Sequence, residues 1–239
     1  MRQHRLGFLV PPGNPTVEPE VIAMTPPGVT VHFTRMQASG VTGSLSGQEQ
    51  RNREQINSLD TTVPLLAMVK PAVIALAHTA TSYTLGRHDE QILLDRLHAA
   101  YGVKVITAFG SVIAALRALG VGRIAFGTPY GMDTTLQGKA LLEECGVAVA
   151  HFSRLPDVTN IYDETLERAA HLARSVDHPK AEAVFLSGVG MPTVGVIAAL
   201  EAELGKPVLS AASALMWNAL RSAGHTAGVS GFGRLLERL

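Results

Sequence analysis

The sequence contains a two-fold internal repeat, and this repeat constrains the fold more than any other feature. The segment RLGFLVPP at 5–12 resembles RIAFGTPY at 123–130, 118 residues later. Near the end of each copy, VITAFGSVIAALRALG at 105–120 resembles LSAASALMWNALRSAG at 209–224, 104 residues later. The offset decreases along the chain, as shorter loops in the second copy would produce. A period of roughly one hundred residues is too long for a solenoid and indicates a duplicated α/β unit.

Each copy alternates between apolar runs and helical patterns. In the first copy, apolar runs that end in turn residues predict strands at 6–10, 29–36, 72–77 and 103–109. Helices are expected between them at 16–24, 48–69, 88–100 and 111–119, with Pro64 shifting or kinking the second one. This alternation predicts an α/β fold with two pseudo-symmetric domains, each a four-stranded parallel sheet flanked by helices.

The two copies also define the expected domains. The first half spans 1–115 and includes about 214–239, because the last helix can cross back onto it, and the second half spans 116–213. Parallel sheets bind ligands beyond the carboxyl ends of their strands. If the halves face each other, four of the turns that follow strands meet in one cleft, where we expect the active site. These turns lie at 11–14, 78–82, 128–130 and 188–193.

The charge balance argues against a nucleic-acid partner. Lysine plus arginine and aspartate plus glutamate number 20 each, and no long run of one sign occurs. The apolar run near the N-terminus is too short for a signal peptide, and no run approaches the roughly 18 apolar residues of a membrane span. Cys145 is the only cysteine, which excludes an internal disulfide and a cysteine-rich metal site. We therefore expect a cytoplasmic protein that does not bind membranes.

The central strand of each copy ends in a different residue. In the first copy, AVIALA leads into His78, whereas the equivalent residue in the second copy is Gly188. Imidazole titrates near neutral pH and can give or take a proton, so His78 is the candidate catalytic group. The alternative is a histidine that only donates a hydrogen bond within the cleft. No second histidine lies nearby at metal-ligand spacing, so no metal is expected.

Five segments together resemble the aspartate/glutamate racemase superfamily, above all its branch of maleate cis-trans isomerases and arylmalonate decarboxylases. They are LVPPGNPTVEPE, the turn after AVIALAH, TPY at 128–130, LSGVGMPT from 186, and ALMWNALRSAG. The resemblance implies catalysis without metal or cofactor by cysteines at the two central strand ends, of which the decarboxylases keep only the second, as a proton donor. Here His78 and Gly188 occupy those positions. Thiolate chemistry is therefore excluded, and His78 is expected to act alone.

The resemblance also implies which residues bind the substrate. They are Asn14, Thr79, Ser82, Tyr130, Asn160, Gly188, Val189 and Gly190. In the family, hydroxyls, amides and an asparagine at these positions hold a carboxylate or the enediolate formed from it. Local explanations remain open, because asparagine stabilises proline-rich turns, and serine and threonine commonly follow strands.

These observations predict a cofactor-independent lyase or isomerase that acts on a small carboxylate by proton transfer through an enediolate-like intermediate. With one candidate acid or base, decarboxylation, double-bond isomerisation or hydration fits better than two-base racemisation. The alternative is a small-carboxylate-binding or sensor protein on the same scaffold. No dinucleotide-binding or phosphate-binding glycine motif is present, so no nucleotide cofactor is expected. The resemblance allows homo-oligomers.

Overall fold

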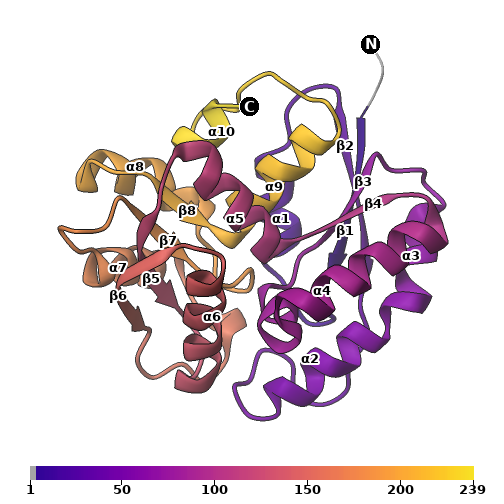
Figure 1. The fold of residues 1–239 in the computed structure, drawn as a ribbon, viewed down its shortest axis with the longest axis horizontal. Coiled ribbons are helices and arrows are strands. Elements are labelled where there is room, and N and C mark those ends of the chain that lie inside the picture. Colours follow the sequence, from indigo (N-terminus) through magenta and orange to yellow (C-terminus); the bar gives the residue numbers. More distant parts are fainter. Residues whose placement is uncertain (1–3) are drawn as a thin grey trace.

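The computed structural model describes residues 4–239, which form two four-stranded parallel sheets with the strand orders β2-β1-β3-β4 and β6-β5-β7-β8 (Figure 1). The first sheet contains β1 (His4–Val10), β2 (Val29–Arg35), β3 (Val73–Leu76) and β4 (Lys104–Thr107). The second contains β5 (Arg123–Thr128), β6 (Ala148–Arg154), β7 (Ala183–Leu186) and β8 (Val208–Ser210). The predicted α/β fold with two pseudo-symmetric sheets is confirmed.

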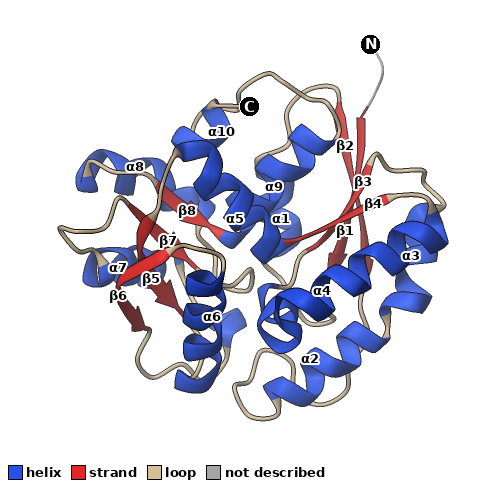
Figure 2. Cartoon of the chain, viewed as in Figure 1, coloured by secondary structure: helices blue, strands red, loops and turns tan. Residues whose placement is uncertain are grey.

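Helices connect the strands in both halves (Figure 2). The first half contains α1 (Val17–Ala23), α2 (Gln48–Asn57), α3 (Leu59–Ala67), α4 (Thr79–Tyr101) and α5 (Ala108–Leu119). The rest are α6 (Met132–Glu144), the 3₁₀ helix η1 (Ile161–Asp163), α7 (Leu166–Val176), α8 (Val194–Leu204), α9 (Ala211–Ser222) and α10 (Arg234–Glu237). None of the helices in residues 4–239 is long and apolar enough to cross a membrane.

The central strands align the turns that build the site. All four residues of β3 and all four of β7 are buried, as expected for strands covered on both faces. In the first sheet Leu9 of β1 lies beside Leu76 of β3, and in the second Gly127 of β5 lies beside Leu186 of β7. Because these strands end at the same edge of each sheet, the turns that follow them lie next to one another.

Helix α4 begins earlier than predicted. The hydroxyl-rich segment 79–82 was expected to be a turn, but it forms the first turn of α4, with His78 as the N-cap residue in an extended conformation. Gly86, at φ 72°, interrupts the helix and separates this first part from the segment predicted at 88–100. His78 therefore sits at the junction between a buried strand and a helix N-terminus.

The segment 48–69 forms two helices instead of one. The break lies at Ser58, and Pro64 lies inside α3, where it removes the N–H that would otherwise bond to the carbonyl of Asp60. The hydroxyl of Tyr101 donates to that carbonyl at 3.3 Å and so provides a partner. Ser58 itself keeps helical dihedral angles, φ −76° and ψ −7°, so the break is a local interruption.

The strand predicted at 103–109 is also shorter, because α5 begins at Ala108. Thr107 is its N-cap, and its hydroxyl accepts a hydrogen bond from the backbone N–H of Gly110 at 2.9 Å. Helices α5 and α9, which occupy equivalent places in the two copies, pack against each other (Figure 1). Helix α9 also contacts α1 and β3, both in the first half. We keep the assignment of 214–239 to the first half as a proposal.

Candidate active site

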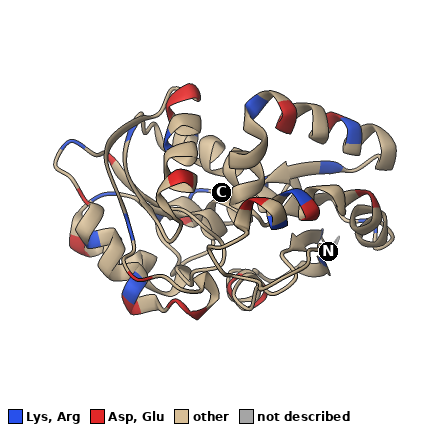
Figure 3. Cartoon of the chain, turned by 90° about the horizontal axis from the view of Figure 1, so that it is seen from below, with Lys and Arg blue, Asp and Glu red and all other residues tan. Residues whose placement is uncertain are grey.

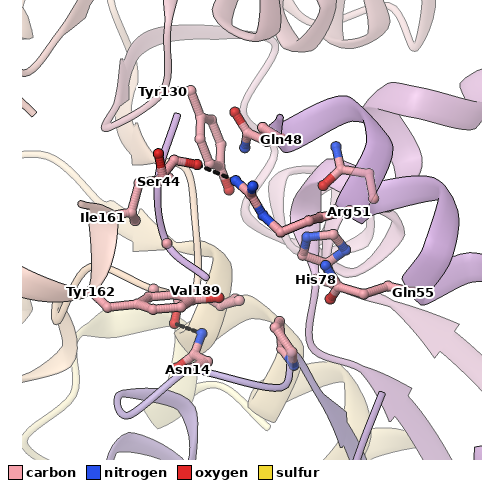
Figure 4. A pocket seen from close by; sticks show the side chains of 14 residues that line it. Asn14, Ser44, Gln48, Arg51, Gln55, His78, Tyr130, Ile161, Tyr162 and Val189 are labelled. Carbon is pink, nitrogen blue, oxygen red and sulfur yellow. Dashed lines mark hydrogen bonds between the residues drawn. The ribbon is translucent and has the colours of Figure 1, made fainter. Parts of the chain in front are cut away.

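A small polar cavity lies between the two halves, beyond the carboxyl ends of the central strands (Figure 4). Its volume is about 40 Å³, which is room for roughly three water molecules. The lining residues are Pro11, Asn14, Gly43, Ser44, Gln48, Arg51, Asn52, Gln55, His78, Tyr130, Ile161, Tyr162, Val189 and Gly190. Both halves contribute, as the predicted cleft requires.

His78 enters the cavity from the end of β3. Its Nδ1 atom lies 2.9 Å from the hydroxyl of Thr81, one helical turn further along α4. The opposite edge of the ring, which carries Nε2, faces the cavity beside Arg51 and Gln55 (Figure 4). Burial lowers the pKa of His78 to about 4, so the imidazole is neutral at pH 7.

One face of α2 forms a polar wall that sequence reasoning missed. Gln48, Arg51, Asn52 and Gln55 follow the spacing i, i+3, i+4, i+7, which places them on the same side of a helix. This spacing is readable in the sequence. It was overlooked because an apolar pattern running from Ile56 into α3 suggested one continuous helix with a single buried face.

Arg51 is the only cationic side chain that lines the cavity. It is 9% exposed, and its guanidinium donates to the backbone carbonyls of Ser44 and, at 2.7 Å, Ser46. Within residues 4–239 no carboxylate lies within 4.0 Å of it. The buried oxygen Oε1 of nearby Gln55 also lacks a hydrogen-bond partner. A buried charge without a counter-charge is costly, and an anionic ligand would supply one.

Asn14 lines the cavity and also binds the second half. Its Oδ1 accepts from the backbone N–H groups of Thr16 at 2.8 Å and Val17 at 3.0 Å, which fixes the start of α1. Its Nδ2 donates to the carbonyl of Val189 at 3.1 Å. The local structural role that the sequence left open is therefore present, at a residue that still borders the cavity.

The hydroxyls of Tyr130 and Thr79 lie on the side of the second central strand end. Tyr130 is buried, and burial raises its pKa well above the usual range, so the phenol keeps its proton. The hydroxyl of Thr79 is fully buried without a hydrogen-bond partner. Of the two, only Tyr130 lines the cavity, so its hydroxyl is the donor available to a ligand oxygen.

Residues 6–236 match the family model described as arylmalonate decarboxylase. The chain belongs to the arylmalonate decarboxylase family. This confirms the predicted branch of the superfamily.

Two relatives match 98% and 70% of this family member. The maleate isomerase of Nocardia farcinica is 29% identical over 244 residues, or 98% of this chain and 96% of the relative. The arylmalonate decarboxylase of Bordetella bronchiseptica is 30% identical over 177 residues, or 70% and 71% of the two chains. Because these relatives are an isomerase and a decarboxylase, the prediction of a lyase or isomerase is confirmed ahead of the sensor alternative.

Solved structures of the family have the same fold. The crystal structure of the maleate isomerase from Pseudomonas putida S16 superposes with a TM-score of 0.88 at 25% identity and covers 98% of each chain. A cysteine-to-serine variant of the Nocardia farcinica isomerase, which carries a covalently bound succinylcysteine intermediate, gives 0.88 at 28% identity with the same coverage. Both sheets of this family member are therefore matched.

Unlike the family pattern, the second central strand end of this chain has no side chain. Gly188 adopts φ +91°, and a Cβ built there would lie 3.2 Å from the hydroxyl of Tyr130 and 3.2 Å from Pro129. Gly188 itself does not line the cavity, whereas Val189 and Gly190 do. Tyr130 and Pro129 thus crowd the space that a side chain at 188 would need.

Three other predicted binding residues, Thr79, Ser82 and Asn160, also lie off the cavity. The hydroxyl of Ser82 donates to the carboxyl of Glu90 at 2.5 Å, so it points away from His78. Asn160 accepts from the backbone N–H of Tyr162 at 2.9 Å and donates to the carbonyl of Thr42 at 3.3 Å. These hydrogen bonds of Asn160 hold the loop that carries Gly43 and Ser44 against the segment that carries Tyr162. The sequence alone does not distinguish an asparagine at 160 that binds substrate from one that joins two loops.

Cys145 lies outside the cavity. It is the C-cap residue of α6 and is half-buried in a separate surface groove that also contains Arg87 and Arg117. Its side chain also packs against the edge of the hydrophobic core. Within residues 4–239, no group of three or more His, Cys, Asp or Glu side chains is placed to hold a metal ion.

Proposed function

We propose that this family member decarboxylates a small malonate-type acid without a cofactor, and that His78 protonates the enediolate left after CO2 departs. The observation that carries the proposal is the Nε2 edge of His78, which faces the cavity from the end of β3. His78 is the only histidine among the lining residues, and no cysteine is among them. One proton donor is sufficient for this reaction.

Isomerisation through a thioether is the less favoured reaction. A variant of the Nocardia farcinica isomerase carries a succinylcysteine intermediate, which requires a cysteine thiol at the substrate. In this chain the only thiol is that of Cys145, in the separate groove. A reaction that needs a covalent sulfur adduct therefore has no nucleophile here.

The cavity suggests how the substrate binds. The guanidinium of Arg51 provides the positive charge for one carboxylate, and charge-assisted hydrogen bonds of this kind are stronger than neutral ones. The hydroxyl of Tyr130 and the backbone amides of Val189 and Gly190, all from residues that line the cavity, hold the carboxylate on which the enediolate forms. Donors fixed before the reaction stabilise developing negative charge without reorganising.

The proposed reaction is balanced by a single proton. The bond between the α-carbon and the departing carboxylate breaks, and its electron pair spreads into the remaining carboxylate as the enediolate. His78 gives the proton on Nε2 to the α-carbon and takes a proton back from water. Because the donor lies on one side of the cavity, the enediolate should be protonated on one face, so methylmalonate in D2O should give α-deuterated propionate of one handedness. The small cavity favours a small substituent over an aryl group.

The test is turnover of malonate, methylmalonate, phenylmalonate and maleate in D2O, followed by NMR. We expect methylmalonate to yield propionate with one deuterium on the α-carbon. His78→Gln should lower kcat roughly 100- to 10,000-fold, the usual contribution of acid–base catalysis, while the thermal midpoint stays unchanged. The matched control is His171→Ala, at an exposed histidine of α7.

Two outcomes would contradict the proposal. Equal turnover by wild type and His78→Gln would remove His78 from the chemistry. Carboxylates that raise the melting temperature but are never consumed would support the sensor alternative instead.

We retain three further predictions about partners and location: a cytoplasmic protein, no nucleic-acid partner, and the ability to form homo-oligomers. The absence of a nucleic-acid partner is supported by the charge distribution, since basic and acidic residues are interspersed over the same elements in Figure 3. Sedimentation velocity of the purified chain would determine its oligomeric state.

A further inference from the structure

The contact between His78 and Thr81 contains information about the proton on the imidazole ring. Thr81 is fully buried, and the only hydrogen-bond partner of its hydroxyl among residues 4–239 is Nδ1 of His78, at 2.9 Å. A neutral imidazole carries one proton, on either Nδ1 or Nε2. The direction of this one hydrogen bond therefore decides which nitrogen carries it.

Counting the hydrogens gives a clear preference. If Nδ1–H donated to Thr81, the hydroxyl proton of Thr81 would be buried with no acceptor, which is destabilising. If the hydroxyl donates to Nδ1, both groups are satisfied and the ring proton lies on Nε2. Among the described residues 4–239, none forms a hydrogen bond with Nε2, which faces the cavity. The second arrangement leaves no buried donor unpaired.

We propose that Thr81 is a positioning residue that holds neutral His78 in the Nε2–H tautomer, so that the ring offers a proton to the cavity and does not accept one from it. The tautomer assignment stands on the hydrogen-bond geometry alone, and its catalytic consequence rests on the proposed function. A histidine in this tautomer can protonate an enediolate but cannot act as the base that removes an α-proton. The structure thereby favours decarboxylation over reactions that begin by deprotonating carbon.

The surroundings support a neutral ring that gives up a proton. Burial keeps the pKa of His78 at about 4, so the neutral form dominates at pH 7. After Nε2–H transfers its proton to the α-carbon, the ring is briefly an imidazolate. The hydroxyl of Thr81 still donates to Nδ1, and the guanidinium of Arg51 lines the same cavity, so both stabilise that anion. Water then restores the proton to Nε2.

The experiment combines NMR with kinetics. In protein labelled with 15N-histidine, two-bond 1H–15N correlations distinguish a protonated ring nitrogen from an unprotonated one, and the signals of His78 are those that vanish in His78→Gln. We expect Nε2 protonated and Nδ1 unprotonated at pH 7. Thr81→Val, which keeps the shape and removes the hydroxyl, should populate the Nδ1–H form, and Thr81→Ser should restore the wild-type pattern.

The kinetic signature follows the tautomer. Thr81→Val should lower kcat about tenfold to 100-fold with little change in KM, because only proton donation is affected, and Thr81→Ser should recover most of the loss. The control is Thr62→Val in α3, which also loses a buried hydroxyl, one that donates to the carbonyl of Ser58 at 2.9 Å. It should leave both the spectrum of His78 and kcat unchanged.

The outcomes separate the two proposals. A protonated Nδ1 in the wild type would overturn the inference, even if Thr81→Val failed to fold. An unchanged His78 spectrum in folded Thr81→Val would show that Thr81 does not set the tautomer. An Nε2–H ring in a protein that turns over no carboxylate would refute the proposed function and leave the tautomer assignment in place.

Discussion

Two related contacts join the halves of this molecule, and they are built differently. In each half, the turn after the first strand reaches the central strand end of the other half. In the first contact, here called the polar contact, Asn14, Thr16 and Glu20 bind backbone groups of 189–194. In the second, here called the aromatic contact, Tyr130 packs edge-on against Tyr83, with ring centroids 6.3 Å apart.

The difference explains why a duplicated scaffold has a one-sided cavity. In the polar contact, Thr16 and Asn14 occupy the carbonyls of Gly190 and Val189, and Gly188 between the halves carries no side chain. In the aromatic contact, Tyr83 and Tyr130 pack behind the strand end and leave the Nε2 edge of His78 facing the cavity. The polar contact holds the backbone at the second strand end in place, whereas the aromatic contact leaves a reactive side chain, His78, facing the cavity.

The largest expected effect is at Glu20, in the polar contact. Its Oε1 accepts from the backbone N–H groups of Thr193 and, at 2.8 Å, Val194, while its Oε2 is buried without a partner. Burial raises the pKa of Glu20 from 4.5 to about 7, although the two backbone hydrogen bonds lower it. The folded state therefore binds this proton more tightly than the unfolded state, and stability should fall as the pH rises from 4.5 through 7, by about 3 kcal/mol.

Urea unfolding of wild type and Glu20→Gln at pH 5 and pH 8 checks this. Glutamine is neutral at both pH values and keeps an acceptor for Val194, so the variant should lose about 3 kcal/mol less than wild type between them. The control is Glu18→Gln on the same helix, where loss of the surface ion pair with Arg35 should cost less than about 1 kcal/mol. If the free energy of unfolding changed equally with pH in wild type and Glu20→Gln, the ionisation of Glu20 would not destabilise the contact between the halves.

The next effect concerns a helix that only the first half has. Between its second and third strands the first half holds both α2 and α3, whereas the second half has η1 and α7. Arg51 of α2 brings the cationic charge of the cavity, so Arg51→Gln should raise KM for a carboxylate substrate about 10- to 100-fold, as loss of a hydrogen bond to a charged group does. Steady-state kinetics would measure it.

A neighbouring arginine supplies the control. Arg53 lies on the exposed face of α2, paired with Glu49 at 2.7 Å, so Arg53→Gln should leave KM unchanged. Arg51→Lys should recover part of the affinity, because lysine keeps the charge but not the fork of donors. Equal KM values for Arg51→Gln and wild type would mean that substrate recognition belongs to the strand ends shared by both halves.

Gly188→Ala tests why the end of β7 carries no side chain. The backbone there has φ +91°, and the new methyl group would press on Tyr130, so we expect a loss of about 1–3 kcal/mol in the free energy of unfolding. Gly131→Ala is the matched control, since its φ is −62° and a Cβ there meets nothing within 4 Å. Gly131 is the N-cap residue of α6, where alanine is less favourable than glycine, so the control should cost less than about 1 kcal/mol. If Gly188→Ala were as stable as wild type, the two strand ends would differ only in their side chains and not in backbone conformation.

The repeat and the apolar strands were predictable because they depend on local pattern. The runs at β3 and β7 are buried on both faces, which leaves a continuous apolar signature. The break at Ser58 was missed because Ile56 and Leu59 continue the helical spacing across it. Small hydroxyl residues resemble a turn, so the start of α4 at Thr79 was also misjudged.

The site was less predictable, since its chemistry depends on tertiary placement. His78 and Tyr130 were found from motifs, and both line the cavity. Arg51 carries no motif, and most arginines lie on the surface, so only the fold reveals that it is buried without a carboxylate partner. Ser82 was misjudged because its partner, Glu90, lies beyond the kink at Gly86, a feature that the motif does not encode.

The smallest expected effect is in the aromatic contact. The hydroxyl of Tyr83 lies 2.8 Å from that of Ser187 at the end of β7, and both are buried. A double-mutant cycle of Tyr83→Phe and Ser187→Ala should give a coupling of about 1 kcal/mol in urea unfolding. Tyr101→Phe, which removes an exposed bond to the carbonyl of Asp60, should cost less. A coupling near zero would mean that ring packing alone holds this contact, and the two contacts would then differ in kind as well as in strength.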